Sequence, residues 1–91
     1  MPVDVIAVRP LPEYCLELDY ANGERRRFDM RPLLAMTPWT AIAAPALFKR
    51  VRVEHGTVAW PGEIDVAPET LYADSVPMAW AAQTQRRPGS V

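Results

Sequence analysis

The chain has 91 residues, of which 49% are hydrophobic and 23% charged, and its formal net charge at pH 7 is −1. These values predict one globular domain with a modest core rather than a disordered chain, and no run approaches the roughly 20 apolar residues that span a bilayer. The charge balance excludes an overall positive field that would attract nucleic acid to the whole surface.

The N-terminal third of the chain carries β-strand patterns. Residues 3–8 are rich in β-branched side chains, and we expect Pro10 and Pro12 to end this strand, because proline cannot donate a ladder hydrogen bond. Residues 14–20 alternate in polarity, which predicts a second, half-buried strand. One face of this strand carries Tyr14, Leu16, Leu18 and Tyr20, and the other carries Cys15, Glu17 and Asp19.

A tight hairpin is expected directly after the second strand. Asn22-Gly23 between two alternating segments is the strongest short hairpin signal, and it predicts that residues 25–28 return antiparallel to residues 14–20. The two faces of the returning strand carry Arg26 with Phe28, and Arg25 with Arg27.

The middle of the chain predicts three short helical segments, at residues 30–36, 38–43 and 45–49. Each has an early proline, at a position where the missing N–H costs no helical hydrogen bond. Asp29 and Thr37 precede two of these segments and are residue types that cap free N–H groups. None is long enough to be stable alone, so packing on the sheet must hold each one. The expected inward residues are Leu33, Leu34, Ile42, Leu47 and Phe48.

A second hairpin is predicted between residues 51 and 60, with His55-Gly56 as its turn. Pro61-Gly62 closes its second strand, which ends in Trp60. We expect Trp60 to anchor the core, because a large aromatic side chain beside a turn usually packs inward.

These segments, with a further helix at residues 68–73, predict an α+β fold in which two antiparallel hairpins form a small sheet with several short helices. We expect residues 1–75 to form this single domain and residues 76–91 to be a C-terminal extension. The extension is predicted to begin as a helix capped by Ser75 and to end as a polar tail. Its large apolar residues, Met78 and Trp80, either fold back on the sheet or dock on another chain, since both residue types are enriched at interface cores.

The most specific motif runs from Trp60-Pro61 through Asp65 to Leu71-Tyr72, behind a Tyr-x-Leu-x-Leu strand and an Asn-Gly-Glu turn. With its motifs in this order, the chain resembles the bacterial domain-of-unknown-function family 2442 over roughly residues 3–74. Glu63-Ile64 departs from the shorter link that the family pattern leads us to expect before the aspartate.

The resemblance implies a small α+β protein whose activity is unknown. Members of the family stand alone or precede a helix-turn-helix DNA-binding domain. They are often encoded beside another small protein, in an arrangement that resembles a toxin–antitoxin pair. Because little chain follows residue 75, we expect a stand-alone partner protein without a second, DNA-binding domain.

Residue types for catalysis or metal binding are sparse. Cys15 is expected to be inert, because the sequence places no base or cation beside it, and His55 is expected to serve a turn. Glu63 and Asp65 are too few for a hard metal, and one Cys with one His excludes a zinc site. The Asp65 side chain is expected instead to accept hydrogen bonds that fix the loop before Pro68. With no glycine-rich phosphate motif present, we expect no cofactor and no enzymatic activity.

The N-terminus and the cysteine count bear on the compartment. No basic region precedes the first apolar residues, so a secretory signal is not expected. A lone Cys15 forms no internal disulfide, which suits a reducing environment. We therefore expect a bacterial-type cytoplasmic protein that does not associate with membranes.

The most prominent surface feature is the run Arg25, Arg26 and Arg27, with Arg31 close beyond it. One interpretation is a solvated strand whose charges discourage aggregation, with Glu17 and Asp19 on the facing strand as partners. The other is a positive patch for an acidic protein or a nucleic-acid backbone. Nucleic acid is the less favoured ligand, because the chain is not basic overall and its aromatic residues alternate to the opposite face.

From the sequence we therefore expect a non-enzymatic protein–protein interaction module, antitoxin-like or regulatory, whose partner is a small neighbour-encoded protein. The candidate partner surface is Arg25, Arg27, Arg31, Met78 and Trp80, and the structural signature is Trp60, Asp65, Leu71 and Tyr72. The alternative is a nucleic-acid-binding regulator that uses Arg25, Arg26, Arg27 and Arg31. A homo-oligomer is a further option.

Overall fold

The computed structural model describes residues 3–78 of the chain. The strands are β1 (Val5–Leu11), β2 (Cys15–Tyr20), β3 (Arg25–Asp29), β4 (Arg52–Glu54), β5 (Thr57–Trp60), β6 (Ile64–Asp65) and β7 (Val76–Pro77). The helices are α1 (Arg31–Leu34), α2 (Pro45–Phe48) and α3 (Pro68–Ala73), and the 3-10 turns are η1 (Pro12–Tyr14) and η2 (Trp39–Ile42).

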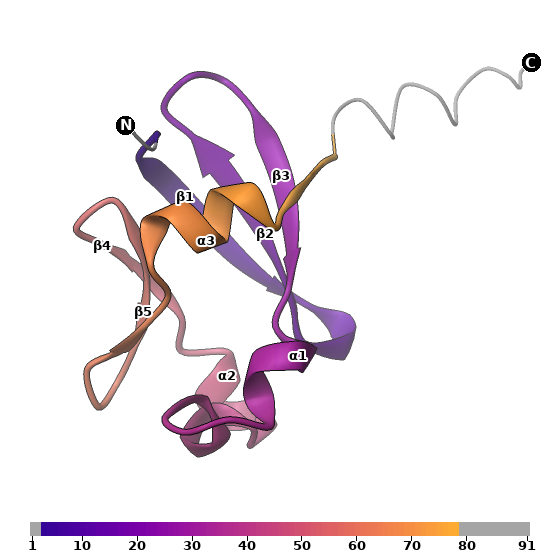
Figure 1. The fold of residues 1–91 in the computed structure, drawn as a ribbon, viewed down its shortest axis with the longest axis vertical. Coiled ribbons are helices and arrows are strands. Elements are labelled where there is room, and N and C mark those ends of the chain that lie inside the picture. The colour runs from indigo at the N-terminus through magenta and orange to yellow at the C-terminus, as the bar shows by residue number, and fades with distance from the viewer. Residues whose placement is uncertain (1–2, 79–91) are drawn as a thin grey trace, which may run out of the picture.

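The strands form two antiparallel sheets, with the orders β1-β2-β3-β7 and β4-β5-β6 (Figure 1). The predicted α+β class and both predicted hairpins are confirmed, and the two hairpins lie in separate sheets. The turns have the expected backbone: His55 and Gly56 have φ of 54° and 76°, and Gly23 has φ of 94°. No helix in residues 3–78 is long and apolar enough to cross a membrane.

The first strand is longer than the sequence suggests. We expected Pro10 to lie beyond its end, but β1 continues to Leu11, and Pro10 pairs with Leu16 of β2. The reason is that β1 is the outermost strand of its sheet, where one side of the backbone needs no ladder partner and proline is tolerated. This extension places Arg9 opposite Glu17.

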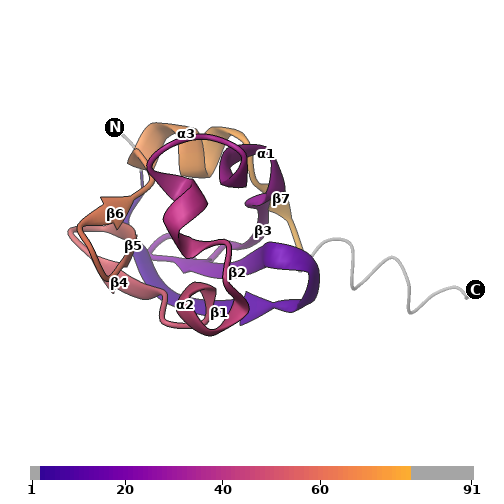
Figure 2. The same ribbon diagram turned by 90° about the horizontal axis from the view of Figure 1, so that it is seen from below.

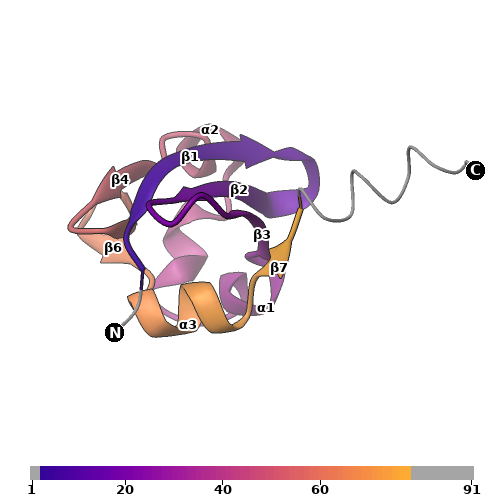
Figure 3. The same cartoon turned by 90° about the horizontal axis from the view of Figure 1, so that it is seen from above.

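The core lies between the two sheets and α3. Figures 2 and 3 show α3 across the interior from β1 and β2, with the second sheet at one end. Trp60 has no exposed surface, and its indole N–H donates a hydrogen bond to the carbonyl oxygen of Phe48 at 2.9 Å. Leu71 of α3 is also fully buried. Tyr72 packs edge-on against Tyr20, with ring centroids 5.1 Å apart. The predicted inward packing of Trp60 is therefore confirmed, and Leu71 and Tyr72 of the same motif also pack against the core.

The predicted middle helices are present but shorter, at α1, η2 and α2. The expected caps by Asp29 and Thr37 are wrong in position, because the N-caps are Met30 for α1 and Pro38 for η2 and neither makes a side-chain capping hydrogen bond. Asp29 Oδ1 does accept the backbone N–H of Arg31, the first residue of α1, at 2.9 Å. Ile42 and Phe48 are buried as predicted, but Leu47 is 37% exposed. In a single helical turn, neighbouring residues point about 100° apart. Phe48 faces the core and Leu47 lies at the surface, whereas Leu33 and Leu34 are both partly buried against the core as predicted.

The prediction of a helix capped by Ser75 is wrong for the residues that the structure describes there. Val76 and Pro77 form β7, which pairs with Arg27 and Arg26 of β3. The Ser75 hydroxyl donates to the carbonyl oxygen of Tyr72 at 2.7 Å and accepts from Arg26 Nε, so it is not free to cap a following turn. The backbone N–H of Met78 then donates to the carbonyl oxygen of Arg25 at 2.7 Å.

Candidate interaction surface on the outer face of the sheet

Pleating places the charged residues of β2 and β3 on one face of the first sheet, the face opposite the core. The register pairs Glu17 with Arg27 and Asp19 with Arg25, while Leu16 and Phe28 point to the other face and are buried. We call the charged side the outer face. The prediction that Arg25 and Arg27 share a face, with Glu17 and Asp19 opposite them, is confirmed.

Arg25 is held by carboxylates of the neighbouring strand. Its Nε lies 2.9 Å from Asp19 Oδ1 and 3.4 Å from Glu17 Oε2. On the far side of these acids, Arg9 Nε lies 3.0 Å from Glu17 Oε1, and Arg9 Nη2 lies 2.9 Å from Asp19 Oδ2. Hydrogen bonds from Arg9 and then from Arg25 lower the pKa of Asp19. The positive charge of Arg25 is therefore largely committed within the sheet.

The sequence reasoning missed Arg9. Its side chain is only half-buried. If the strand is predicted to end before Pro10, the local sequence assigns Arg9 to the loop that follows. The signal that could have found it is the pairing register, because a β1 strand that runs through Pro10 puts Arg9 directly opposite Glu17.

Arg31 is also paired. Its Nη2 lies 2.9 Å from Asp29 Oδ2, and its Nε lies 3.1 Å from Asp29 Oδ1, so the two side chains form a bidentate ion pair. Hydrogen bonding from the Arg31 side chain lowers the pKa of Asp29. Arg31 therefore lies at the end of the outer face with its charge already matched.

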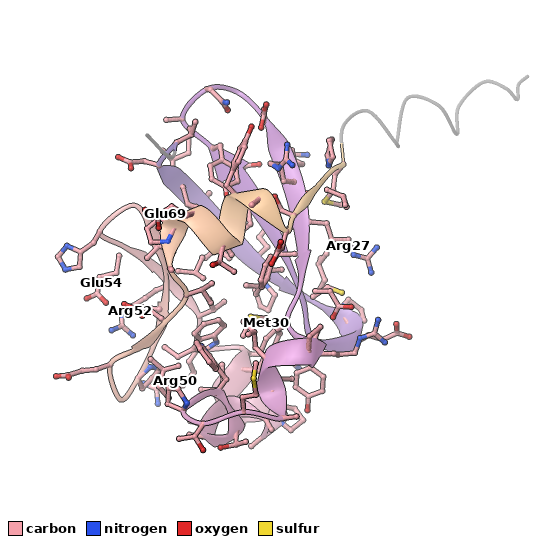
Figure 4. All side chains as sticks on the ribbon, viewed as in Figure 1. Arg27, Met30, Arg50, Arg52, Glu54 and Glu69 are labelled. Carbon is pink, nitrogen blue, oxygen red and sulfur yellow. The ribbon has the colours of Figure 1, made fainter. Side chains whose placement is uncertain are left out.

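Arg27 differs from both. It is exposed, it is in no ion pair among residues 3–78, and its side chain extends away from β3 (Figure 4). Its Nη2 lies 3.4 Å from the Sγ atom of Cys15. This contact is the main cause of the raised pKa of Arg27, to which the carboxylates of Asp29 and Glu13 add. The outer face thus presents one guanidinium with capacity to bind an anion.

The expectation that no cation lies beside Cys15 is wrong, because Arg27 contacts its sulfur. Cys15 is only 2% exposed, however, so an electrophile has little access to it. Arg26 points to the inner face, where its guanidinium lies 4.3 Å from the centroid of the Tyr72 ring and its Nη2 donates to the carbonyl oxygen of Ser75 at 2.9 Å. It joins α3 to the hairpin and is not part of the outer face.

The order of strands, turns and short helices on this framework is matched by one family. The sequence model described as "Protein of unknown function (DUF2442)" matches residues 5–77. The chain belongs to the DUF2442 family. The match includes the outer face of this DUF2442 domain and all of the elements from β1 to β7. Neither the curated proteins nor the solved structures include a match to the chain.

The remaining predicted site residues of the DUF2442 domain are distributed over several places. Met78 is half-buried beside β3, and Trp80 lies outside the described residues. The predicted role of the Asp65 side chain is wrong within residues 3–78, because the side chain is exposed and it is the backbone carbonyl that accepts a hydrogen bond, from Trp39 Nε1 at 3.0 Å. In the part of the chain that the structure describes, no three His, Cys, Asp or Glu side chains are grouped to hold a metal ion.

Proposed function

We propose that this DUF2442 protein is a non-enzymatic protein–protein interaction module that binds an acidic surface of its partner through the outer face. The observation that carries this proposal is the difference between the arginines. Arg25 and Arg31 are paired with carboxylates, whereas Arg27 is exposed and has none within ion-pair distance among residues 3–78. A carboxylate on a partner would extend the existing alternation of charge along the sheet.

We further propose that the partner is a small protein encoded beside this one, in an antitoxin-like or regulatory arrangement in the bacterial cytoplasm. This part of the proposal rests on the gene arrangement that membership of the family implies. A domain that acts by binding needs no catalytic group, which agrees with the structural use of the outer-face side chains.

A nucleic-acid-binding regulator is the second candidate. It is disfavoured because most of the same arginines are already paired within the protein. Proteins that bind duplex DNA tightly use on the order of six to ten phosphate contacts, and each one adds to the salt dependence of binding. Of the four arginines in the predicted basic strand, three are already paired with carboxylates: Arg25 with Asp19, Arg31 with Asp29 and Arg26 with Glu24. Arg27 alone would give a weak contact.

Affinity co-purification from the native host tests the proposal, with nuclease-treated and untreated samples read by mass spectrometry and absorbance. We expect a stoichiometric small protein that survives nuclease treatment. Arg27→Ala should reduce its recovery severalfold, because the free guanidinium is removed. Arg50→Ala is the matched control, since Arg50 is exposed on the loop after α2 and away from the outer face (Figure 4).

Other outcomes decide against the proposal. Nucleic acid recovered only from untreated samples, and lost with Arg25→Ala and Arg27→Ala, would support the regulator instead. Recovery of the chain alone, with a doubled mass in solution, would indicate a homo-oligomer. Full recovery of a partner by Arg27→Ala would move the interface off the outer face.

A further inference from the structure

A pocket of about 430 Å³ lies between η1 and α2, at the end of the sheet where β1 turns into β2. Its walls are Pro10, Leu11, Pro12, Tyr14, Pro45 and Phe48, and its rim carries Glu13 and Lys49. The volume is within the range of sites that hold small ligands or inserted side chains, and an apolar lining with few polar groups is typical of them. The three prolines have fixed φ angles, so this wall loses little freedom when a ligand binds.

The pocket is shaped by a turn that is strained and firmly held. Glu13 and Tyr14 are consecutive non-glycine residues with φ of 64° and 60°, in the left-handed region that side chains disfavour. Three contacts keep Tyr14 there. Its hydroxyl donates to the carbonyl oxygen of Ala43, its own carbonyl accepts from Met30 N–H at 2.9 Å, and its ring meets Phe48 edge-on at 5.0 Å. Strain that the surrounding structure maintains in this way is concentrated at ligand-binding sites.

The charges around the pocket favour an acidic ligand. Lys49 is exposed and is in no ion pair within the described chain. Glu13 is the one acid in the pocket lining, and its carboxylate is in no ion pair within residues 3–78. Two exposed cations, Lys49 on the rim and Arg27 beside Cys15, therefore face one acid on the rim, Glu13.

We infer that this pocket receives a bulky apolar side chain, best an aromatic one, from a partner segment in which carboxylates flank that side chain. The inference rests on the proposed function and gives the partner's chemistry: an acidic segment with an aromatic anchor. Anchors of this kind, in a desolvated pocket with a charged rim, carry most of the affinity of protein interfaces. Cys15 joins Arg27 to the pocket, because its sulfur contacts Arg27 Nη2 at 3.4 Å and its thiol donates to the carbonyl oxygen of Glu13 at 3.8 Å, so one partner segment can contact both.

Four acetylated, amidated pentapeptides provide the test, titrated into isotope-labelled protein and followed by amide chemical shifts. They combine a central tryptophan or alanine with flanking glutamates or lysines. We expect only the glutamate-flanked tryptophan peptide to shift the amides of Leu11, Glu13, Tyr14, Phe48 and Lys49. Lys49→Glu should weaken this peptide about threefold to tenfold, as expected for a surface charge contact that is reversed. Arg50→Glu, the exposed neighbour outside the pocket lining, should leave its affinity unchanged.

The outcomes separate this inference from the proposed function. Shifts confined to the amides near Arg25 and Arg27, equal binding of the alanine peptide, or no shifts at millimolar peptide would each overturn the pocket assignment. If a partner is still co-purified and is lost with Arg27→Ala but kept with Lys49→Glu, the proposed function stands and only the pocket inference fails. If the partner is lost with Arg27→Ala and also with Lys49→Glu, the result supports both the proposed function and the pocket inference.

Discussion

Tyr20 is the most informative position for a stability experiment, because its ring is buried and its hydroxyl has no hydrogen-bond partner among the described residues. An unpaired buried polar group costs about 1–3 kcal/mol. Tyr20→Phe removes that group and keeps the ring that packs on Tyr72. We expect a free energy of unfolding at pH 7 that is unchanged or higher by up to about 1 kcal/mol, because loss of the oxygen leaves a small void.

The pH dependence of unfolding gives an independent value for the contribution of the Tyr20 hydroxyl to the free energy of unfolding. Burial raises the pKa of Tyr20 from 10.0 to about 12. The folded state therefore holds the phenol proton more tightly than the unfolded state, so this contribution is complete below pH 10 and is lost as the pH rises towards 12. The full shift corresponds to about 2.7 kcal/mol, and about half of it is lost at about pH 11. Wild-type protein should lose that amount relative to Tyr20→Phe.

Urea unfolding at pH 7 and pH 11, followed by tryptophan fluorescence to which the buried Trp60 contributes, measures both effects. Tyr72→Phe is the matched control. The Tyr72 hydroxyl donates to Glu24 Oε1 at 2.8 Å, so its removal should destabilise the protein by about 1–2 kcal/mol. The reasoning would be refuted if Tyr20→Phe lowered the free energy of unfolding by more than about 1 kcal/mol at pH 7. It would also be refuted if the free energies of unfolding of wild type and variant changed in parallel with pH.

Two further predictions concern the second sheet. Trp60→Ala should lower the free energy of unfolding by about 3–5 kcal/mol, since it leaves a cavity and frees the carbonyl of Phe48; normal urea stability with loss of a partner would instead place Trp60 in an interface. Gly56→Ala should cost more than Gly23→Ala in the same assay. Both residues have positive φ, but a Cβ at Gly56 would lie 2.5 Å from Asp4 Oδ1, while one at Gly23 meets nothing within 4 Å. Equal losses would show that Asp4 moves away freely.

The sequence was sufficient where a local pattern determines structure. Asn22-Gly23 and His55-Gly56 define both hairpins, because few residues adopt the positive φ that such turns need. Alternation then assigns the faces of β2 and β3 without any knowledge of tertiary contacts. This is why Arg25 and Arg27 could be placed together on the outer face in advance.

Features that depend on non-local pairing could not be predicted. β7 exists because residues near the end of the domain meet β3, and no local pattern in two residues encodes that. The charge state of the outer face also depends on Arg9, whose position follows from a strand that continues through Pro10. The pocket between η1 and α2 joins segments more than thirty positions apart in the chain, and nothing in either segment alone indicates it.

The short strand β7 also determines how this protein can associate. Because Met78 N–H donates to Arg25, the alternation of an antiparallel ladder turns Pro77 towards the open edge of the sheet. A proline at that position offers a carbonyl but no N–H, so an approaching strand finds no donor there. Pro77 therefore disfavours the addition of another strand at β7, whether in a fibre or in a strand-swapped dimer. At this edge of the sheet, a partner is therefore recognised through side chains and not by strand addition.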